Sequence, residues 1–289
     1  MAARKRATPA PLIRPDAGRK RIAFGWYGGK FSHLEWLLPL LPDCHHYCEP
    51  FAGSAAVLLN RAPAPVETYN DLDGEVVNFF RTLRDDKERL VEAVGLTPFS
   101  REEFGLACVV DPALPPLERA RRFYVRARQV RTGLAQTASL GRWANCKGTS
   151  RGGMSGVISR WLGAVEALPE IAERLLRVQI ENRSAIDVIQ LYDSPRTLFY
   201  CDPPYVPGTR TARKAYGPHE MSDADHQQLL DALRQCKGKV MLSGYPSRLY
   251  DEALAGWTRH TDDKPNNASG AKVKGRETEV VWCNFEGAR

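Results

Sequence analysis

The chain has 289 residues, of which 43% are hydrophobic, and a formal net charge of +7. This length suits one large domain or a core with a smaller insert, and the apolar fraction is ordinary for a globular protein with a buried core. No run approaches the roughly 18 apolar residues of a membrane helix, and the basic, proline-containing start lacks the apolar stretch of a secretory signal, so we exclude those classes and expect a cytoplasmic protein.

Residues 1–21 hold most of the positive charge. They contain seven basic side chains and one acid, Asp16, which gives a local charge of +6. Because this segment has little apolar pattern, we expect a disordered tail that contacts phosphates only and reads no sequence. Solubility explains the charge of such a tail equally well, so the tail does not by itself identify a partner.

The first candidate ligand-binding segment is residues 26–30, Trp-Tyr-Gly-Gly-Lys. Two glycines let the backbone approach a ligand closely, and Lys30 offers a cation beside it. A glycine turn in front of a helix is common, so this segment alone is a weak signal.

The seven cysteines are expected to be reduced thiols, because an odd number without a secretory signal does not suit a disulfide framework. Residues 44–48, Cys-His-His-Tyr-Cys, look superficially like a zinc cluster, but no second ligand pair follows at zinc-finger spacing. We interpret this segment as the beginning of a buried strand with alternating side chains, and we predict no metal site.

The next part of the chain alternates between strand and helix patterns. Residues 47–51 and 66–70 suit buried strands, residues 54–60 suit a helix with Ser54 as its cap, and residues 75–83 carry apolar side chains at helical spacing. Strand, helix and strand in this order indicate an α/β unit with a parallel sheet.

Residues 49–55, Glu-Pro-Phe-Ala-Gly-Ser-Ala, lie where the first predicted strand turns into a helix. Small residues there allow a nucleotide-like ligand to approach closely. The full glycine pattern of a pyrophosphate-binding turn is missing, which favours a ligand without phosphates, such as S-adenosylmethionine.

Asp71 follows Gly53 by 18 residues, at the end of the next strand, where an acid commonly binds ribose hydroxyls. A loop or helix-cap aspartate would look the same.

From residue 97 to residue 175 the chain becomes helical or irregular. Phe123, Ala127, Val130 and Leu134 share one face of a predicted helix, and arginines crowd its other faces.

This part of the chain is also strongly basic. Between Arg119 and Arg160 there are ten basic residues and no acid, which is the electrostatic footprint of a polyanion partner. Residues 141–156 are rich in glycine and are predicted to form a long loop that can follow a nucleic-acid groove. A solubility effect is the less favoured explanation for this segment.

Strand patterns return at residues 197–200, 239–242 and 279–284. The simplest architecture is one α/β core that is interrupted by a mainly helical, basic insert. We therefore predict a basic tail (1–21), an α/β core made of two segments (22–96 and 176–289) and a basic insert (97–175).

Residues 202–205, Asp-Pro-Pro-Tyr, carry the strongest chemical signal. They directly follow a predicted strand, and open α/β sheets place their ligand sites at the carboxyl ends of strands. The Asp202 carboxylate and the Pro204 carbonyl can accept both N–H bonds of an exocyclic amine, while Tyr205 stacks on the ring. The quartet therefore suits a planar amine, and a proline-rich turn with a capping aspartate is the structural alternative.

The candidate ligand-binding motifs of this chain, taken in sequence order, resemble those of the Dam-like group of DNA adenine-N6 methyltransferases. That family has Trp-x-Gly-Gly-Lys, then Glu-Pro-Phe-x-Gly, then an acid in an Asp-x-[Asp/Asn] turn, then Asp-Pro-Pro-Tyr. The set is specific, whereas each piece alone is not, and the matches spread over about residues 22–285. Here the four motifs are residues 26–30, 49–53, 71–73 and 202–205.

The resemblance implies a Rossmann-like class I methyltransferase core with a mostly parallel sheet, and S-adenosylmethionine as the cofactor. It implies double-stranded DNA as the partner, no membrane, and a bacterial or phage-encoded context. Contacts with the cofactor are implied at Trp26, Lys30, Asp71 and Asp202, and the insert is implied to recognise the DNA target.

Residues and resemblance together give the expected site. The expected catalytic residues are Asp202, Pro203, Pro204 and Tyr205. The expected cofactor-binding residues are Trp26, Tyr27, Gly29, Lys30, Glu49, Phe51, Gly53, Asp71 and Asp202. The expected DNA-binding residues are Arg122, Arg126, Arg128, Arg131, Arg142, Lys147, Arg151, Arg210 and Lys274.

The expected reaction is methyl transfer to N6 of an adenine that is flipped out of the duplex. Stacking of the base on Tyr205 would return roughly 1–3 kcal/mol of the cost of flipping. The loops at residues 206–220 and 262–277 are rich in Gly, Pro, Asn and basic residues. We expect both to be mobile without DNA and the first to close over the target.

Two other functions stay open at this point. One is an amino-methyltransferase that acts on RNA or on a protein amide. Enzymes that act on protein glutamine typically have Asn-Pro-Pro-Tyr as their own motif, so Asp202 argues against that substrate. The other is a DNA-binding protein with an inactive core, against which the intact quartet and Lys30 argue. The recognition sequence, the oligomeric state and the biological role (restriction partner, phage modification or solitary regulator) also stay open.

Overall fold

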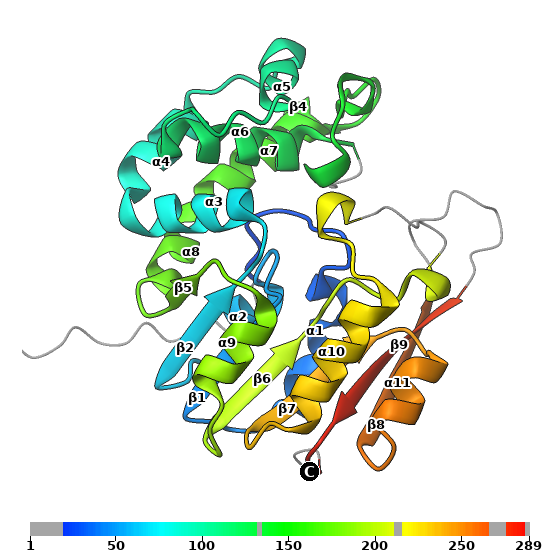
Figure 1. Ribbon diagram of the computed structural model, residues 1–289. Coiled ribbons are helices and arrows are strands. Elements are labelled where there is room, and N and C mark those ends of the chain that lie inside the picture. Colours follow the sequence, from blue (N-terminus) through cyan, green and yellow to red (C-terminus); the bar gives the residue numbers. More distant parts are fainter. Residues whose placement is uncertain (1–19, 132–134, 211–215, 266–275, 287–289) are drawn as a thin grey trace, which may run out of the picture.

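The computed structural model describes residues 20–131, 135–210, 216–265 and 276–286 (Figure 1). The expectations for residues 1–19 and for Lys274 lie outside these residues. Lys20 and Arg21, which we had included in the basic tail, belong to the folded part of the chain: Lys20 Nζ lies 2.8 Å from Glu35 Oε1, and Arg21 Nε lies 2.6 Å from Glu170 Oε1.

A seven-stranded sheet forms the centre of the molecule, in the order β5-β2-β1-β6-β7-β9-β8. The first five strands pair in parallel, and β9 pairs antiparallel with both β7 and β8. The expectation of a Rossmann-like core with a mostly parallel sheet is therefore confirmed. The strands are β1 (His46–Glu49), β2 (Val66–Asn70), β5 (Gln179–Glu181), β6 (Thr197–Cys201), β7 (Lys239–Gly244), β8 (Thr258–Pro265) and β9 (Arg276–Cys283).

Helices cover both faces of this sheet, because its central strands are apolar on both sides. All four residues of β1 and all five of β6 are buried, as expected for parallel strands. Tyr47 and Leu198 pack with α1 (Leu34–Leu37), α2 (Ala56–Asn60) and α3 (Gly74–Asp85). Cys48 and Phe199 pack on the opposite face with α9 (Ala185–Tyr192), α10 (Asp223–Arg234) and α11 (Arg248–Ala253); α9 and α10 lie in front of the sheet in Figure 1.

The predicted insert is mainly helical and lies above the carboxyl ends of the parallel strands (Figure 1). Its apolar side chains Phe123, Tyr124 and Trp161 belong to the same core cluster as Tyr47 of the sheet. The insert is therefore packed onto the catalytic core. Its elements are α5 (Arg101–Ala107), α6 (Pro116–Gln129), α7 (Gly156–Glu166), α8 (Leu168–Leu175) and the hairpin of β3 (Ser150–Arg151) and β4 (Met154–Ser155); α4 (Lys87–Gly95) precedes them.

Two helix predictions were wrong in detail. The helix expected over residues 54–60 begins at Ala56, and its N-cap is Ala55 in a left-handed conformation (φ 56°) with no side-chain capping bond. Ser54 is buried in the turn and does not cap the helix.

The helix predicted from the shared face of Phe123, Ala127, Val130 and Leu134 also extended too far. Helix α6 ends at Gln129, because Val130 leaves it to form an isolated bridge with Trp143. The Arg131 N–H donates to the Arg142 carbonyl at 2.7 Å, which replaces the helical pattern. Leu134 lies outside the described residues.

The loop predicted over residues 262–277 is in part a strand pair. Strand β8 continues to Pro265, and β9 begins at Arg276, with Asp262 paired to Glu279 and Pro265 paired to Arg276. The reason is that antiparallel pairing satisfies the backbone of both segments although their side chains are polar. The rest of the predicted loop, residues 266–275, lies outside the described part of the chain.

Within the described part of the chain, no helix has the length and apolarity required to cross a membrane. The seven cysteines are free thiols, as the sequence predicted.

Candidate active site

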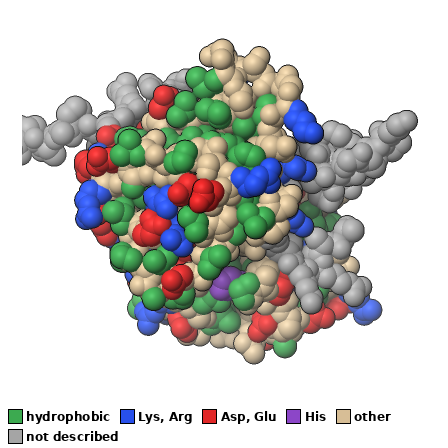
Figure 2. Space-filling model, turned by 90° about the horizontal axis from the view of Figure 1, so that it is seen from above, with side chains coloured by type: hydrophobic (Ala, Val, Ile, Leu, Met, Phe, Trp, Pro, Cys, Tyr) green, Lys and Arg blue, Asp and Glu red, His purple; other side chains and the backbone are tan. Residues whose placement is uncertain are grey.

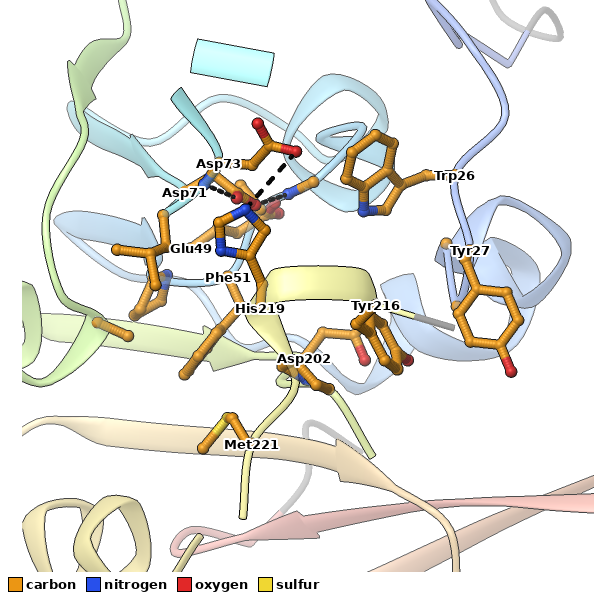
Figure 3. A pocket seen from close by; sticks show the side chains of 18 of the residues that line it. Trp26, Tyr27, Glu49, Phe51, Asp71, Asp73, Asp202, Tyr216, His219 and Met221 are labelled. Atoms are coloured by element: carbon orange, nitrogen blue, oxygen red, sulfur yellow. Dashed lines mark hydrogen bonds and ion pairs between the residues drawn. The ribbon is translucent and has the colours of Figure 1, made fainter. Parts of the chain in front are cut away.

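A cavity of about 360 Å³ opens at the carboxyl ends of β1, β2 and β6. Figure 3 shows the side chains of Trp26, Phe51, Asp71, Asp202 and Tyr216 around it. The parallel strands bring their carboxyl ends to one edge of the sheet, which is where open α/β folds place their ligands. Segments that are far apart in sequence thus meet at a single cavity.

Two glycines make room for neighbouring aromatic side chains. Gly53 has φ +49°, and a Cβ there would lie 2.6 Å from Cδ1 of the Trp26 indole. Gly28 has φ +72°, and a Cβ there would lie 2.8 Å from the Tyr216 hydroxyl. Both positions combine a left-handed backbone with close contact, so both require glycine.

The Asp71 carboxylate is fixed by the backbone of two turns. Its Oδ2 accepts the Gly53 N–H at 2.7 Å, and its Oδ1 accepts the Asp73 N–H at 2.8 Å. Burial raises the pKa of Asp71 to about 6, although both backbone hydrogen bonds oppose this shift. Asp73 in turn caps α3 by accepting the Glu75 N–H, and its Oδ2 lies 4.0 Å from His219 Nε2.

Lys30 and Asp202 form a buried ion pair at the floor of the cavity. Lys30 Nζ lies 2.6 Å from Asp202 Oδ1 and donates to Asp202 Oδ2 at 2.8 Å and to the Gly28 carbonyl at 2.7 Å. Burial disfavours the charge of Lys30, but Asp202 and Glu279 outweigh burial and raise its pKa. Burial also raises the pKa of Asp202, against the opposing effect of Lys30.

The quartet divides between the cavity wall and the interior. Asp202 and Pro204 line the cavity, whereas Pro203 is buried and Tyr205 is only 4% exposed. The Tyr205 hydroxyl donates to Glu279 Oε1, and Lys30 Nζ lies 4.9 Å from the centroid of the Tyr205 ring. Burial raises the pKa of Glu279 to about 7.

Glu49 ends β1 beneath the same cavity. Its Oε1 accepts the Tyr47 hydroxyl at 2.7 Å, and the side chain is almost entirely buried. Burial raises the pKa of Glu49 to about 8, so this carboxyl is largely protonated at neutral pH.

Every residue that we expected to contact the cofactor lines this cavity. Their contact with a cofactor stays a prediction, but the fold brings together four segments that the sequence keeps apart. These residues are Trp26, Tyr27, Gly29, Lys30, Glu49, Phe51, Gly53, Asp71 and Asp202.

The expected DNA-binding residues lie in different surroundings. Arg126 is buried and donates to the Ala107 carbonyl at 2.8 Å, and Arg122 Nε lies 2.7 Å from Glu118 Oε1. Arg210 is buried next to the cavity, 2.6 Å from Glu220 Oε2. The other described members are partly or fully exposed on the insert: Arg128, Arg131, Arg142, Lys147 and Arg151.

Sequence reasoning missed several residues of the site. Tyr216 and His219 come from the segment after the quartet, which was predicted only as a loop, and Met221 follows that loop directly. Glu279 was predicted only as part of a strand, and its contact with Tyr205 bridges 74 positions in the sequence. Alternation along the strand could have placed Glu279 on a buried face, but nothing in the local sequence names its partner.

The sheet order and this cavity define a Rossmann-like methyltransferase core. The family model of the D12 class N6 adenine-specific DNA methyltransferases matches residues 26–265. The chain belongs to this family. It is an adenine-specific DNA methyltransferase that acts on N6 of adenine, and such an enzyme requires a methyl donor.

Curated relatives are named as methyltransferases, and two of the three are named for adenine methylation. The chain is 27% identical over 285 residues to the type II methyltransferase M1.LlaDCHI of Lactococcus lactis subsp. cremoris, covering 90% of this chain and 94% of that protein. It is 25% identical over 262 residues to the DNA adenine methylase of Serratia marcescens, covering 84% and 88%. It is 27% identical over 248 residues to the DNA N-6-adenine-methyltransferase of Escherichia phage P1, covering 81% of this chain but 31% of that protein.

Proposed function

We propose that the chain transfers the methyl group of S-adenosylmethionine to N6 of an adenine that is flipped out of double-stranded DNA. The observation that carries this proposal is that Asp202 and Pro204 open onto the same cavity as the Gly53 turn and Asp71. Acceptors for an amine and a cradle for a nucleoside therefore face each other across one cavity.

The residues present fit S-adenosylmethionine. The absence of a side chain at Gly53 lets the Trp26 indole pack against the turn, and the backbone of this turn lines the cavity, where a nucleoside can approach it. Each carboxylate oxygen of Asp71 has a second lone pair available for ribose hydroxyls. Phe51 and Trp26 provide apolar surface on the cavity wall. When bound, the cofactor supplies a methyl group activated on a sulfonium.

The chain's own groups act on the amine of the target base. The lone pair of N6 is delocalised into the ring, so the amine is a poor nucleophile. Hydrogen bonds from N6 to Asp202 and to the Pro204 carbonyl localise this lone pair, while Lys30 fixes the carboxylate in place. Catalysis by this arrangement rests on positioning and preorganised acceptors. Tyr205 provides the stacking face, and its ring must become uncovered when the base enters, because only 4% of the residue is exposed.

We assign DNA contact to basic residues of the insert that are partly or fully exposed. Arg128, Arg151 and Arg160 line one cleft of about 510 Å³ and have no ion-pair partner among the described residues. Figure 2, which looks down on the insert, shows Lys and Arg side chains grouped on the right, next to residues not described, with Asp and Glu more frequent on the left. Glu166 and Glu170 line the same cleft, but arginines that form no ion pair with them are available for phosphates.

Other arginines of α6 serve the fold instead. Arg119 pairs with Glu75, Arg121 pairs with Glu118 and Glu103, and Arg126 binds a carbonyl. Arg122 and Arg210, which also have carboxylate partners, are therefore weaker candidates for DNA contact than the sequence suggested. We keep Arg128, Arg131, Arg142, Lys147 and Arg151 as the proposed DNA-binding residues and add Arg160.

Methyl transfer by purified protein tests the proposal. The full chain is incubated with S-adenosylmethionine labelled on its methyl group and unmethylated duplex DNA, and the nucleosides are analysed by mass spectrometry. We expect labelled N6-methyladenine. Asp202→Ala should lower the rate by about 10²–10³ because one preorganised acceptor is lost, while Asp231→Ala, on the exposed face of α10, should leave it unchanged. A rate for Asp202→Ala within a few-fold of the parent would refute the proposed role of the quartet.

A further inference from the structure

Glu279 contacts two groups of the proposed site although it belongs to none of the motifs. It lies on β9, beyond the residues that the family model matches. Its Oε1 accepts the hydroxyl of Tyr205 and lies 3.6 Å from Lys30 Nζ. The residue is 5% exposed, so water does not substitute for these partners.

The sheet topology explains how a late strand reaches the quartet. Val280 pairs with Gly244 at the carboxyl end of β7, and β7 lies next to β6, which leads into Asp202. Glu279 therefore stands at the edge of the sheet where the cavity opens. Side chains alternate along a strand, so Glu279 shares its face with Val281, which packs in the same core cluster as Tyr200.

Two other groups contact the Tyr205 ring. The neighbouring Tyr245 ring meets it edge-on at a centroid distance of 4.6 Å, and the Lys30 ammonium lies 4.9 Å from its centroid. Lys30 is itself shared between Asp202, at 2.6 Å, and Glu279. Glu279 is thus the group that connects the stacking residue to the residue that fixes the amine acceptor.

We infer that Glu279 is a positioning residue for methyl transfer, which holds the Tyr205 ring and the Lys30–Asp202 pair in the arrangement that the flipped adenine needs. The inference rests on the proposed function. It concerns a residue that acts through Tyr205 and Lys30 and does not touch the reacting atoms. Loss of Glu279 still leaves Lys30 paired with Asp202 and bound to the Gly28 carbonyl, so the cofactor side of the cavity keeps its contacts.

A double-mutant cycle tests this inference in the full chain. Glu279→Leu removes the acceptor of the Tyr205 hydroxyl, Tyr205→Phe removes the hydroxyl itself, and Glu279→Gln retains an acceptor. We expect the single-turnover methylation rate of Glu279→Leu to fall about tenfold or more, since small displacements of reacting groups have effects of this size. The dissociation constant for S-adenosylmethionine, measured by calorimetry, should change less than about threefold on the same reasoning.

Two further results separate positioning from a general loss of structure. The variant with both Glu279→Leu and Tyr205→Phe should be no slower than the slower single variant, because both changes remove one interaction. Glu279→Gln should recover a large part of the rate. As a charge-matched control, Glu252→Gln, on the exposed side of α11, should methylate at the parent rate.

Three outcomes would overturn the inference. They are a rate for Glu279→Leu within about twofold of the parent, full multiplication of the two losses in the double variant, and a Tyr205→Phe variant that matches the parent. The last measurement decides the matter even if Glu279→Leu does not fold, because Tyr205→Phe leaves every charge in place. If the parent itself makes no N6-methyladenine, the proposed function fails; if only the Glu279 results fail, the proposed function stands.

Discussion

The Lys30 ammonium contacts two carboxylates that lie far apart in the sequence. Asp202 follows β6 and Glu279 lies on β9, and both are within 3.6 Å of Lys30 Nζ. In a buried region, such contacts are strong only if each partner is held by further bonds. The Gly28 carbonyl and the Tyr205 hydroxyl supply those bonds. The conformation of four side chains thus depends on one cation.

Substitutions of Tyr205 test the stacking role at the residue scale. Tyr205→Ala should strongly weaken capture of the flipped base, whereas Tyr205→Phe keeps the ring face and should lose less, because stacking needs a ring and not a hydroxyl. A fluorescent adenine analogue at the mapped target position would measure the flipped fraction. Equal signals in the Ala and Phe variants would exclude stacking on this residue.

Buried carboxyls near the cavity predict how stability changes with pH. The pKa of Glu49 is raised to about 8, of Glu279 to about 7 and of Asp71 to about 6, in each case mainly by burial. Between about pH 4 and these values the folded state binds more protons than the unfolded chain, so the free energy of unfolding falls as pH rises. For Glu49 the decrease should be on the order of 1–3 kcal/mol between pH 5 and pH 8.

Denaturant unfolding of the parent and of Glu49→Gln across that pH range measures this effect. The amide retains the hydrogen bond with Tyr47 and cannot ionise, so the variant should lose stability less steeply as pH rises. Identical pH slopes in the two proteins would show that Glu49 is already ionised in the folded state.

At the scale of elements, the central strands could be predicted because β-branched and aromatic residues are concentrated in them. Residues 66–70 match β2, and residues 197–200 lie within β6. Details that depend on pairing could not be predicted. The polar segment at residues 262–265 forms a strand only because β9 lies beside it, and α6 stops at Gln129 because a distant Trp143 pairs with the next residue.

The residues of the candidate site also fall into those that the local sequence predicts and those that it does not. Residues 26–30, 49–53 and 202–205 could be predicted because glycine, proline and charged residues at strand ends have direct chemical meaning. Tyr216 and Glu279 could not, because their roles come from contacts that span the chain. Likewise, the basic character of α6 was visible in the sequence, but the acids that neutralise its inner arginines lie on other elements.

The two kinds of arginine in the insert should respond differently to substitution. Arg151→Ala should weaken DNA binding and reduce the slope of log affinity against log salt by about 1, because one phosphate contact is lost. Arg126→Ala, the matched control, should leave binding by the folded protein unchanged but lower the free energy of unfolding by roughly 1–3 kcal/mol, because the buried Ala107 carbonyl loses its donor.

Titrations of duplex DNA at several salt concentrations, together with denaturant unfolding, measure both effects. The assignment of the insert's two sides would be wrong if Arg126→Ala reduced DNA affinity and Arg151→Ala did not. If Arg151 also reads a base, its loss should relax the methylated sequence at one position, at a cost of roughly 1–3 kcal/mol.

At the scale of the whole molecule, the insert and the sheet share a hydrophobic core. Phe123 of α6 packs edge-on against Phe24, at a centroid distance of 5.0 Å, and Phe24 contacts Trp26 of the cavity at 5.7 Å. The proposed DNA-recognition surface and the proposed cofactor cavity are therefore linked through packed aromatic rings. Such packing holds the insert at a fixed height above the carboxyl edge of the sheet, where a flipped base must enter.

The most direct test of the account is modification-sensitive sequencing of DNA from a methylation-deficient host that expresses either the parent chain or Asp202→Ala. We predict N6-methyladenine at one recurring sequence with the parent, and none above background with the variant. Methylation at a position other than adenine N6, an equal signal from Asp202→Ala, or no modification by the folded parent would contradict it.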